Sequence, residues 1–478
     1  MTTNKFIFLR QSIRCFTIAA LLFSGKTVAQ KTVAAGTMEV GEARIDISPY
    51  GPIRLSGYVW GRKTESEGVL QQLWAKALVF GSDAQGPSVL ITVDLAGIPA
   101  WIRARVATYL SQKAGIKNSQ LAINASHTHS GPDMGNSHNM YFDPFLPVDQ
   151  LGRIAMYLDS LAPKLEKVAM EALKNRKPSL VSWGQGSVGF GLNRRVIING
   201  KWSGHGKVPN GPVDHTMPLL KVTDLNGQLK AILVGYACHG TTLYDDINKA
   251  HGDWIGEAQL HIEASHPEAI AMVTTGCGGD VDPDLRGTLE YAALHGQTIA
   301  TEVDRLLATP LESLTSPPIG HFKQIQLPFD HVPGSEELIK MTKDKGAKAH
   351  NASVFLERRV RGIPIETGLT YPVQTWTFGN KLAIVFLGGE VVSEYSLRLR
   401  KELGKEKLWV NAYSNDVKAY IPSKRMIPEG GYEVESNMYY YDHPSRFSDK
   451  IEDIIIGTVY ELLPASFKPA TRKKAVAR

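Results

Sequence analysis

The sequence predicts an α/β protein with mixed β-sheets flanked by helices, and two observations carry this prediction. Apolar, β-rich runs alternate with amphipathic helical patterns over most of the 478 residues. The turn sequences Asp224-Leu-Asn-Gly-Gln and Phe378-Gly-Asn-Lys lie next to such runs and indicate β-hairpins. The alternation indicates an α/β fold, and the hairpins add antiparallel strands to its sheets.

Six segments of each type are assigned along the chain. The predicted strands are Ser88–Leu95, Leu121–Ser126, Leu229–Cys238, Ala269–Thr275, Leu382–Gly388 and Leu408–Tyr413. The predicted helices are Pro99–Ala114, Gln150–Lys174, Trp254–Ser265, Leu289–Ala308, Val391–Leu403 and Ile451–Leu463. Because neither a repeat nor a Pro/Ser-rich linker marks a boundary, we expect one catalytic domain over residues 30–464 and a frayed basic tail over 465–478.

The N-terminus has the pattern of a secretory signal peptide. Basic residues precede an apolar stretch over 15–23, and Thr27-Val-Ala29 has the small residues of a cleavage site. The apolar stretch is too short to cross a membrane. We therefore expect residues 1–29 to be removed and the chain to be exported, to the periplasm or outside the cell, without a transmembrane segment.

The charge of the mature chain excludes one class of partner. Residues 1–29 carry four positive charges and no acidic residue, so their removal lowers the formal net charge from +6 to +2. So small a charge gives no case for nucleic-acid binding. We expect a small-molecule or lipid substrate, and the sequence leaves the oligomeric state open.

The segment Asn124-Ala-Ser-His-Thr-His-Ser-Gly-Pro132 carries the strongest functional signal. His127 and His129 follow an apolar run and precede a Gly-Pro break. Residues two apart in an extended segment point to the same side, so both imidazoles can face one pocket. Imidazole is the commonest zinc ligand at neutral pH, and the pair therefore indicates a metal site, with two surface histidines as the alternative.

Polar residues follow three further predicted strands. These strand ends are Cys238-His239-Gly240, Gly276-Cys-Gly-Gly-Asp-Val-Asp282 and Gly388-Gly-Glu390. Sites in α/β folds collect at the carboxyl ends of strands, where loops leave a rigid sheet. We expect the four strand ends to converge if their strands belong to one sheet.

With these residues the chain resembles the neutral (non-lysosomal) ceramidases, over about residues 40–440. The segment Ser126-His-Thr-His-Ser-Gly-Pro132 is similar to the family's Thr-His-Thr-His-Ser-Gly-Pro signature. Weaker similarities occur in the family's order at Gly57-Tyr58, Val93-Asp94, Asn193-Arg194, His239, Gly252-Asp253, Gly279-Asp-Val-Asp-Pro283, Gly389-Glu390 and Tyr420.

The resemblance implies a neutral-ceramidase-like catalytic domain with a Zn²⁺ site. Its implied ligands are His127, His239, Glu390 and Tyr420. Two imidazoles and a carboxylate leave a position on zinc for water or a carbonyl oxygen. For Tyr420 taken alone, a buried aromatic residue in a β-rich segment is the simpler interpretation.

Two more residues take roles from the same resemblance. His129 and Arg194 match residues that contact the scissile group or its developing oxyanion. A salt bridge from Arg194 to Asp253 is the alternative, and Asp253 is also suited to orienting a ligand histidine.

The sequence departs from the family in three places. Asp282 stands where the family carries the serine regarded as its catalytic hydroxyl. A carboxylate cannot replace a hydroxyl in acyl transfer, but it can serve as general base to a metal-activated water or as a further ligand. No room remains after Tyr440 for the family's C-terminal β-sandwich, and the polar His205–His215 region resembles an insertion.

The leading functional hypothesis is an exported zinc-dependent hydrolase that cleaves the amide of an N-acyl sphingosine or a similar N-acyl lipid. A glycan or glycoconjugate substrate is the first alternative and a non-catalytic binding protein is the second. Tyr141, Phe142 and Leu146 are candidates for an apolar lid that would favour a lipid. Cys238 and Cys277, the cysteines of the mature chain, form either a disulfide or two buried free thiols.

Overall fold

The computed structural model describes residues 1–2, 36–58, 61–135 and 146–468. The chain divides into two units, Met1–Val33 and Ala34–Arg478. Nearly all of the predicted leader, the lid residues Tyr141 and Phe142, and the tail beyond residue 468 lie outside the described residues. The fold and the candidate site belong to the second unit.

A nine-stranded mixed sheet forms the larger part of this unit. Its strand order is β10-β9-β8-β5-β1-β2-β3-β4, and β12 pairs with β5 outside this path. The pairs β3–β4 and β9–β10 are parallel, and the other pairs in the sheet are antiparallel. The strands are β1 (Met38–Asp46), β2 (Trp74–Phe80), β3 (Ser88–Val93), β4 (Leu121–Ala125), β5 (Lys177–Ser187), β8 (Thr216–Asp224), β9 (Leu229–Tyr236), β10 (Ile270–Thr275) and β12 (Glu312–Leu314).

Three smaller sheets complete the β-structure of the described residues. A four-stranded sheet has the order β13 (Ile319–Pro328), β14 (Gly368–Phe378), β15 (Leu382–Leu387) and β17 (Leu408–Asn411). A second sheet contains β11 (Val281–Pro283), β6 (Gly191–Ile198) and β7 (Lys201–Val208). The third pairs β16 (Glu390–Val391) with β18 (Tyr420–Ile421) in parallel.

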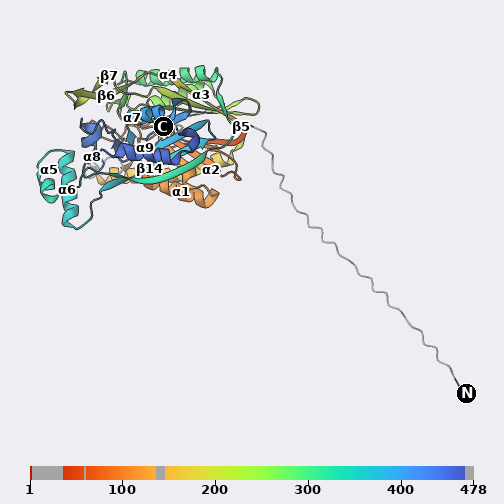
Figure 1. Cartoon of the computed structure of the whole chain (residues 1–478), viewed down its shortest axis with the longest axis horizontal. Helices are drawn as coiled ribbons and strands as arrows, with labels where there is room; N and C mark the ends of the chain where they lie inside the picture. The colour runs from red at the N-terminus through yellow and green to blue at the C-terminus, as the bar shows by residue number, and fades with distance from the viewer. Residues whose placement is uncertain (3–35, 59–60, 136–145, 469–478) are drawn as a thin grey trace, which may run out of the picture. The chain divides into compact units, whose positions relative to one another are not determined.

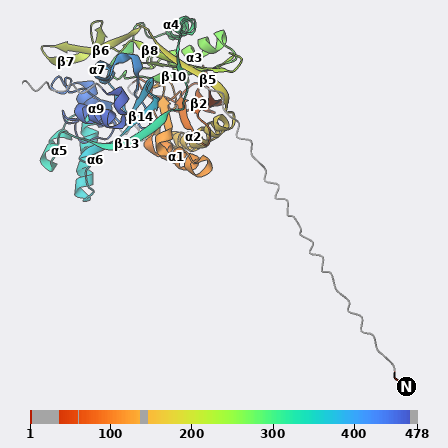
Figure 2. The same ribbon diagram turned by 45° about the vertical axis from the view of Figure 1, so that its right-hand side comes forward.

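Several of the helices lie side by side in pairs. The helix α1 (Ala100–Ala114) packs against α2 (Val148–Lys174), and α2 lies on β1 and β2 through an apolar face that includes Leu161, Leu165 and Val168. Figures 1 and 2 show α3 (Asp253–Ser265) beside α4 (Leu289–Leu307), and α5 (Ser335–Met341) beside α6 (Ala347–Val360). The remaining α-helices are α7 (Ser393–Leu403), α8 (Asn437–Tyr440) and α9 (Ile451–Leu462), of which α9 packs on β13 and β14.

The predicted fold class and elements are confirmed. All twelve predicted segments are present, with ends that differ by at most two residues, and both hairpin turns connect antiparallel neighbours. Most antiparallel strands were not predicted. In the hairpin β6–β7 the residues of β7 are largely exposed, so the sequence there has no apolar face to reveal a strand.

The four polar strand ends converge, although their strands do not belong to one sheet. The strands β4, β9 and β10 belong to the large sheet, but Glu390 follows β15 of the four-stranded sheet. The strands β4 and β10, at opposite ends of the large sheet, are joined through Asn124, whose Oδ1 accepts a hydrogen bond from the Thr275 amide at 2.9 Å. The Asn124 amide group also donates to the carbonyl of Ala412, beyond the end of β17, at 2.8 Å. This buried asparagine therefore joins both sheets below the site.

No helix in the described part of the chain has the length and apolar character needed to cross a membrane.

Candidate metal centre

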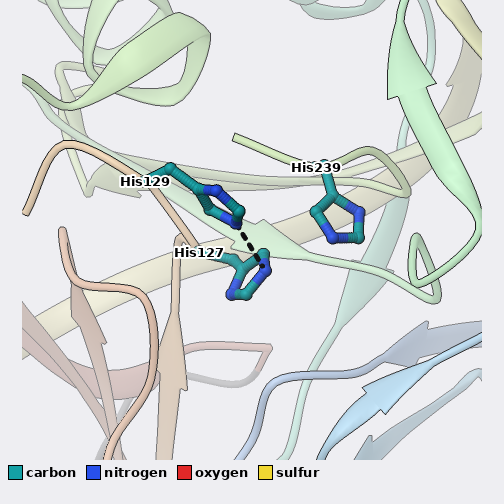
Figure 3. Close-up of side chains that lie close together, drawn as sticks. All are labelled: His127, His129 and His239. Atoms are coloured by element: carbon teal, nitrogen blue, oxygen red, sulfur yellow. Dashed lines mark hydrogen bonds between the residues drawn. The ribbon is translucent and has the colours of Figure 1, made fainter. Parts of the chain in front are cut away.

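Three imidazoles meet where β4 and β9 end. Among the described residues, His127, His129 and His239 form a group whose candidate ligand atoms all lie within 4.8 Å of one another. Figure 3 shows His127 and His129 next to each other on one segment, with His239 approaching from another. The Nε2 atoms of His127 and His129 are 3.2 Å apart. The sequence predicted that His127 and His129 face one pocket, the resemblance implied His239 as a ligand beside His127, and the structure brings all three rings together.

The hydrogen bonds of two rings fix which nitrogen faces the centre. The Nδ1 of His127 lies 2.6 Å from the carbonyl oxygen of Ala96, and the Nδ1 of His239 lies 2.6 Å from that of Gly278. Because a carbonyl oxygen only accepts, each Nδ1 carries a proton and each Nε2 presents a lone pair. This is the arrangement by which metal-binding histidines are oriented.

A carboxylate oxygen completes a group of electron-rich atoms. The Oε2 of Glu390 lies 2.9 Å from Nε2 of His127 and 3.1 Å from Nε2 of His239. Lone pairs that converge in this way repel one another unless a cation lies among them. The donor set therefore fits a zinc ion.

Tyr420 and Tyr441 flank Glu390. The pairing of β16 with β18 places Tyr420 directly opposite Glu390, and its hydroxyl lies 3.2 Å from Nε2 of His239. The hydroxyl of Tyr441 donates a hydrogen bond to the other oxygen of Glu390 at 2.6 Å. Burial raises the pKa of Tyr420 well above its usual value, so its phenol is neutral in the absence of a bound cation.

His129 is the third ring of the group and lies against the backbone of Gly57. A Cβ at Gly57 would come within 2.3 Å of Nδ1 of His129, so this ring fits only against a glycine. Burial, together with the neighbouring His127 and His239, lowers the pKa of His129 well below its ordinary value. His129 is therefore a neutral imidazole at the edge of the candidate metal position.

The loop after β9 is held by Asp253 and Trp254. The Asp253 carboxylate accepts hydrogen bonds from the amides of Thr242 and Leu243 at 3.0 and 2.9 Å. The Trp254 indole donates to the carbonyl oxygen of His239 at 2.8 Å. Asp253 thus supports the backbone that presents His239, while the carboxylates recorded against Arg194 are those of Asp282 and Glu433.

Arg194, on β6, is fixed by three groups. Its Nε donates to Glu433 at 2.9 Å, one terminal nitrogen donates to Asp282 at 3.1 Å, and the other donates to the Tyr420 hydroxyl at 3.2 Å. Glu433 is fully buried and also pairs with Arg195. The guanidinium is thereby held beside the candidate ligand Tyr420, where it can stabilise negative charge that develops on a substrate.

Asp282, on β11, lies between two guanidinium groups. Its Oδ1 accepts from Arg194 at 3.1 Å and its Oδ2 accepts from Arg286 at 2.7 Å. Burial alone would raise the pKa of Asp282, but the two arginines hold it below its usual range. A carboxylate with a lowered pKa is a weak proton acceptor. The general-base role therefore stays a prediction, and the structure adds a second role, which is to orient both arginines.

These residues surround one pocket of about 520 Å³. Six of the seven predicted site residues line it, and His239 is fully buried behind it. Gly57 and Ala96 are the lining residues of the described chain without a polar side-chain atom. Six aromatic side chains contribute to the wall, namely Tyr58, Trp202, Tyr420, Tyr432, Tyr440 and Tyr441.

Two further expectations concern neighbouring residues. Leu146 packs against the hydrophobic core of the protein, so among the predicted lid residues it is accounted for by the core. Cys238 and Cys277 are buried free thiols, which is one of the two alternatives left by the sequence.

Sequence reasoning missed several site residues. Arg286 follows Asp282 by four positions, and this opposite-charge spacing was its available signal. Glu433, Tyr441 and Trp202 gave no signal, because each comes to the pocket from a segment distant in sequence from the histidine motif.

The fold and the site define an α/β protein with a candidate metal centre at its strand ends. Comparison with known proteins specifies the family. The model of the neutral/alkaline non-lysosomal ceramidase family, N-terminal region, matches residues 38–300, and the chain belongs to this family.

Individual relatives carry the same family name. The neutral ceramidase of Drosophila melanogaster is 24% identical over 273 residues, which cover 53% of this chain and 37% of the relative. The neutral ceramidase of Pseudomonas aeruginosa is 24% identical over 232 residues, covering 46% of this chain and 33% of the relative. The matched region thus spans about a third of the length of these curated relatives.

Solved structures extend the likeness in fold to most of the chain. The crystal structure of the Pseudomonas aeruginosa neutral ceramidase has a TM-score of 0.67 at 16% identity and covers 91% of this chain and 76% of that chain. A ceramidase complexed with C2 has the same TM-score and identity. At this identity the likeness establishes a shared α/β fold.

Proposed function

We propose that this protein is a zinc-dependent hydrolase that cleaves an amide bond with metal-activated water. The observation that carries the proposal is the convergence of the Nε2 atoms of His127 and His239 on the Glu390 carboxylate, while a backbone carbonyl accepts from the Nδ1 of each ring. Family membership supports hydrolysis, and the relatives' name, neutral ceramidase, supports an amide as the bond.

In this proposal His127, His239, Glu390 and Tyr420 hold the ion. A bound zinc ion would lower the pKa of a water molecule and polarise the amide carbonyl. The carbonyls of Ala96 and Gly278 keep the two histidines in the ligating tautomer. Tyr441 restrains one oxygen of Glu390 and leaves the other oriented toward the histidines.

The remaining site residues act on the substrate. Arg194 is prepositioned to stabilise charge on the carbonyl oxygen as water adds, because Glu433 and Asp282 hold it in place. His129, a neutral ring beside the candidate metal position, is suited to contact the scissile group or the charge that develops on its oxygen. Asp282 either accepts the proton from water or orients Arg194.

The relatives' name supports an N-acyl lipid such as ceramide as the substrate. A second candidate, a polar N-acylated compound such as a glycan or glycoconjugate, is favoured by one observation. The described pocket wall has no Leu, Ile, Val, Met or Phe side chain to receive an acyl chain. Export of the chain after removal of residues 1–29 also stays a proposal, tested by N-terminal sequencing of the mature protein.

Metal analysis of purified variants tests the site. We expect wild-type protein to hold about one zinc per chain and His239→Ala to hold almost none while keeping its secondary structure. His266→Ala, which alters a partly exposed histidine paired with Asp304, is the matched control and should retain the metal. Full metal occupancy in His239→Ala would refute the assigned centre.

The His129→Ala variant distinguishes two possible sets of metal ligands, one without His129 and one with it. If His129 acts on the substrate, this variant should retain zinc and lose turnover of ceramide or of a short N-acyl amide. Loss of zinc instead would make His127, His129 and His239 the ligands.

A further inference from the structure

Arg286 presents a second guanidinium to the pocket, beyond the one that contacts Tyr420. Its Nε donates to the carbonyl of Thr241 at 2.8 Å, one terminal nitrogen donates to Asp282 at 2.7 Å, and the other donates to the Tyr58 hydroxyl at 3.2 Å. The guanidinium carbon also lies over the ring of Tyr244, 5.1 Å from its centroid. The group is therefore held rigidly.

These contacts leave part of the guanidinium unused. A guanidinium carries five N–H groups, and Arg286 donates three of them to partners among the described residues. One N–H remains on each terminal nitrogen. The Arg286 side chain is 22% exposed and lines the pocket, whereas Arg194 is 7% exposed. Arg286 is thus the more accessible of the two cations.

The charge of Arg286 is only partly compensated. Among the described residues its carboxylate partner is Asp282, whose other oxygen accepts from Arg194. Arg194 has a second carboxylate, Glu433, with no equivalent recorded for Arg286 among the described residues. A negative group on a bound molecule would complete the coordination of Arg286, since guanidinium and carboxylate form strong charge-assisted hydrogen bonds.

The wall around Arg286 is polar and aromatic. Tyr58, Thr241 and His205 line the same pocket, and its described lining contains no large aliphatic side chain. Such a wall favours a compact polar molecule over a hydrocarbon chain, because an acyl chain would meet hydrogen-bonding groups that must lose their water.

We propose that Arg286 determines specificity by binding a carboxylate group of the substrate, so that the protein acts on N-acyl compounds that carry a carboxylate near the scissile amide. The inference rests on the proposed amide hydrolysis and specifies its substrate class. Asp282 then acts as the shared counter-ion that keeps Arg194 and Arg286 apart and oriented, one toward the reacting carbonyl and the other toward the carboxylate.

The test uses substrate pairs that differ in the carboxylate. N-lauroylglycine is compared with N-lauroylethanolamine, and N-acetylneuraminic acid with its methyl ester, so that the two pairs distinguish an amino-acid source of the carboxylate from an acidic-sugar source. Amine release by zinc-loaded protein gives kcat and KM. We expect the acidic member of at least one pair to be preferred in kcat/KM by about 10- to 100-fold, the size of one charge-assisted contact.

Variants of Arg286 identify the cause of the preference. Arg286→Gln should remove it by raising the KM of the acidic member more than that of the neutral member, and Arg286→Lys should restore it in part. Lys167→Gln, an exposed helix position, controls for the change in net charge. Equal kcat/KM within both pairs, or a preference that persists in Arg286→Gln because the ion itself holds the carboxylate, would overturn the inference and leave amide hydrolysis intact.

Calorimetry gives a readout that does not depend on turnover. Binding of each pair member to zinc-loaded protein should show at least tenfold tighter binding of the acid, lost in Arg286→Gln, and equal binding would overturn the inference. If neither the four compounds nor ceramide is cleaved, the proposed hydrolysis fails, while the calorimetric comparison still decides the role of Arg286.

Discussion

Asp282 shows how a single side chain can change what a site does. Its two oxygens are divided between Arg194 and Arg286, and its backbone lies on the short strand β11 that pairs with β6. A hydroxyl at this position would offer one oxygen and no charge, and would leave both guanidinium groups without this counter-ion. The aspartate that replaces the family's serine at position 282 therefore changes the electrostatics of the pocket wall as well as the group available as a general base.

Replacing Asp282 with Asn tests its importance directly. We expect Asp282→Asn to lower kcat by about 10²–10⁴, whether the lost function is proton transfer or the orientation of Arg194, while zinc content is unchanged. Asp284→Asn is the matched control, since Asp284 pairs with Lys207 and does not line the pocket. Loss of zinc from Asp282→Asn would make Asp282 a ligand, and unchanged turnover would reduce it to a turn residue.

The ends of β4 and β9 approach so closely that only glycine fits between them. The segment after β4 bridges to the segment after β9 through Thr128 and Gly240. A Cβ at Gly240 would lie 2.8 Å from the carbonyl oxygen of His127 and 2.9 Å from Cα of Thr128, both backbone atoms. The distance between the proposed ligands His127 and His239 therefore depends on the absence of a side chain at Gly240.

Gly240→Ala should separate these segments. We expect the variant to remain folded and to bind zinc at least tenfold more weakly, because His127 and His239 move apart, as measured by competition with a chelator. Gly189→Ala is the control, since a Cβ there meets nothing within 4 Å. Wild-type zinc affinity in Gly240→Ala would show that the two segments shift together.

The helix α1 begins against a carboxylate from a distant loop. Pro99, its N-cap residue, forms no side-chain cap, and the Ala100 amide instead donates to Asp416 at 3.1 Å. Burial raises the pKa of Asp416 to about 6 from an ordinary value near 3.8. Between these two pH values the folded chain keeps a proton that the unfolded chain has lost, so the free energy of unfolding falls as pH rises from about 4 to about 6.

Asp416→Asn should flatten this dependence. The shift corresponds to at most about 3 kcal/mol. We expect wild-type protein to lose stability relative to Asp416→Asn between pH 4.5 and pH 7.5, as measured by urea unfolding at both values. Asp83→Asn, at an exposed carboxylate, should follow the wild-type curve. Parallel curves for wild type and Asp416→Asn would contradict the raised pKa.

The site depends on two sheets that meet at one place. His127 and His239 come from the large sheet and Glu390 from the four-stranded sheet, and Asn124 holds the sheets together below them. The neighbouring Cys238 and Cys277 lie in this junction and are fully buried. Burial raises the pKa of both thiols, which leaves them unreactive even in an oxidising compartment.

Thiol titration of the chain without residues 1–29 tests this packing. We expect almost no reaction in the native protein and two free thiols after denaturation without reductant. If no thiol appears after denaturation, the cysteines are joined by a disulfide. Rapid reaction of the native protein would show that the junction opens.

The sequence by itself determined the fold class, the six strands and six helices with the strongest patterns, and the segments that carry the candidate ligands. These signals are local, because strand and helix periodicity and a polar residue after an apolar run can be read within one segment. The resemblance in the order of short motifs led to the family that the comparisons confirm.

Only the tertiary structure decided how the groups of the centre are oriented and which further side chains surround them. The tautomers of His127 and His239 depend on the carbonyls of Ala96 and Gly278, and neither histidine motif indicates those partners. Arg286 donates a hydrogen bond to the carbonyl of Thr241, 45 residues earlier in the chain. Glu433 accepts one from Arg194, 239 residues earlier. Such contacts depend on how the sheets pack, and packing is a property of the whole chain that no local pattern encodes.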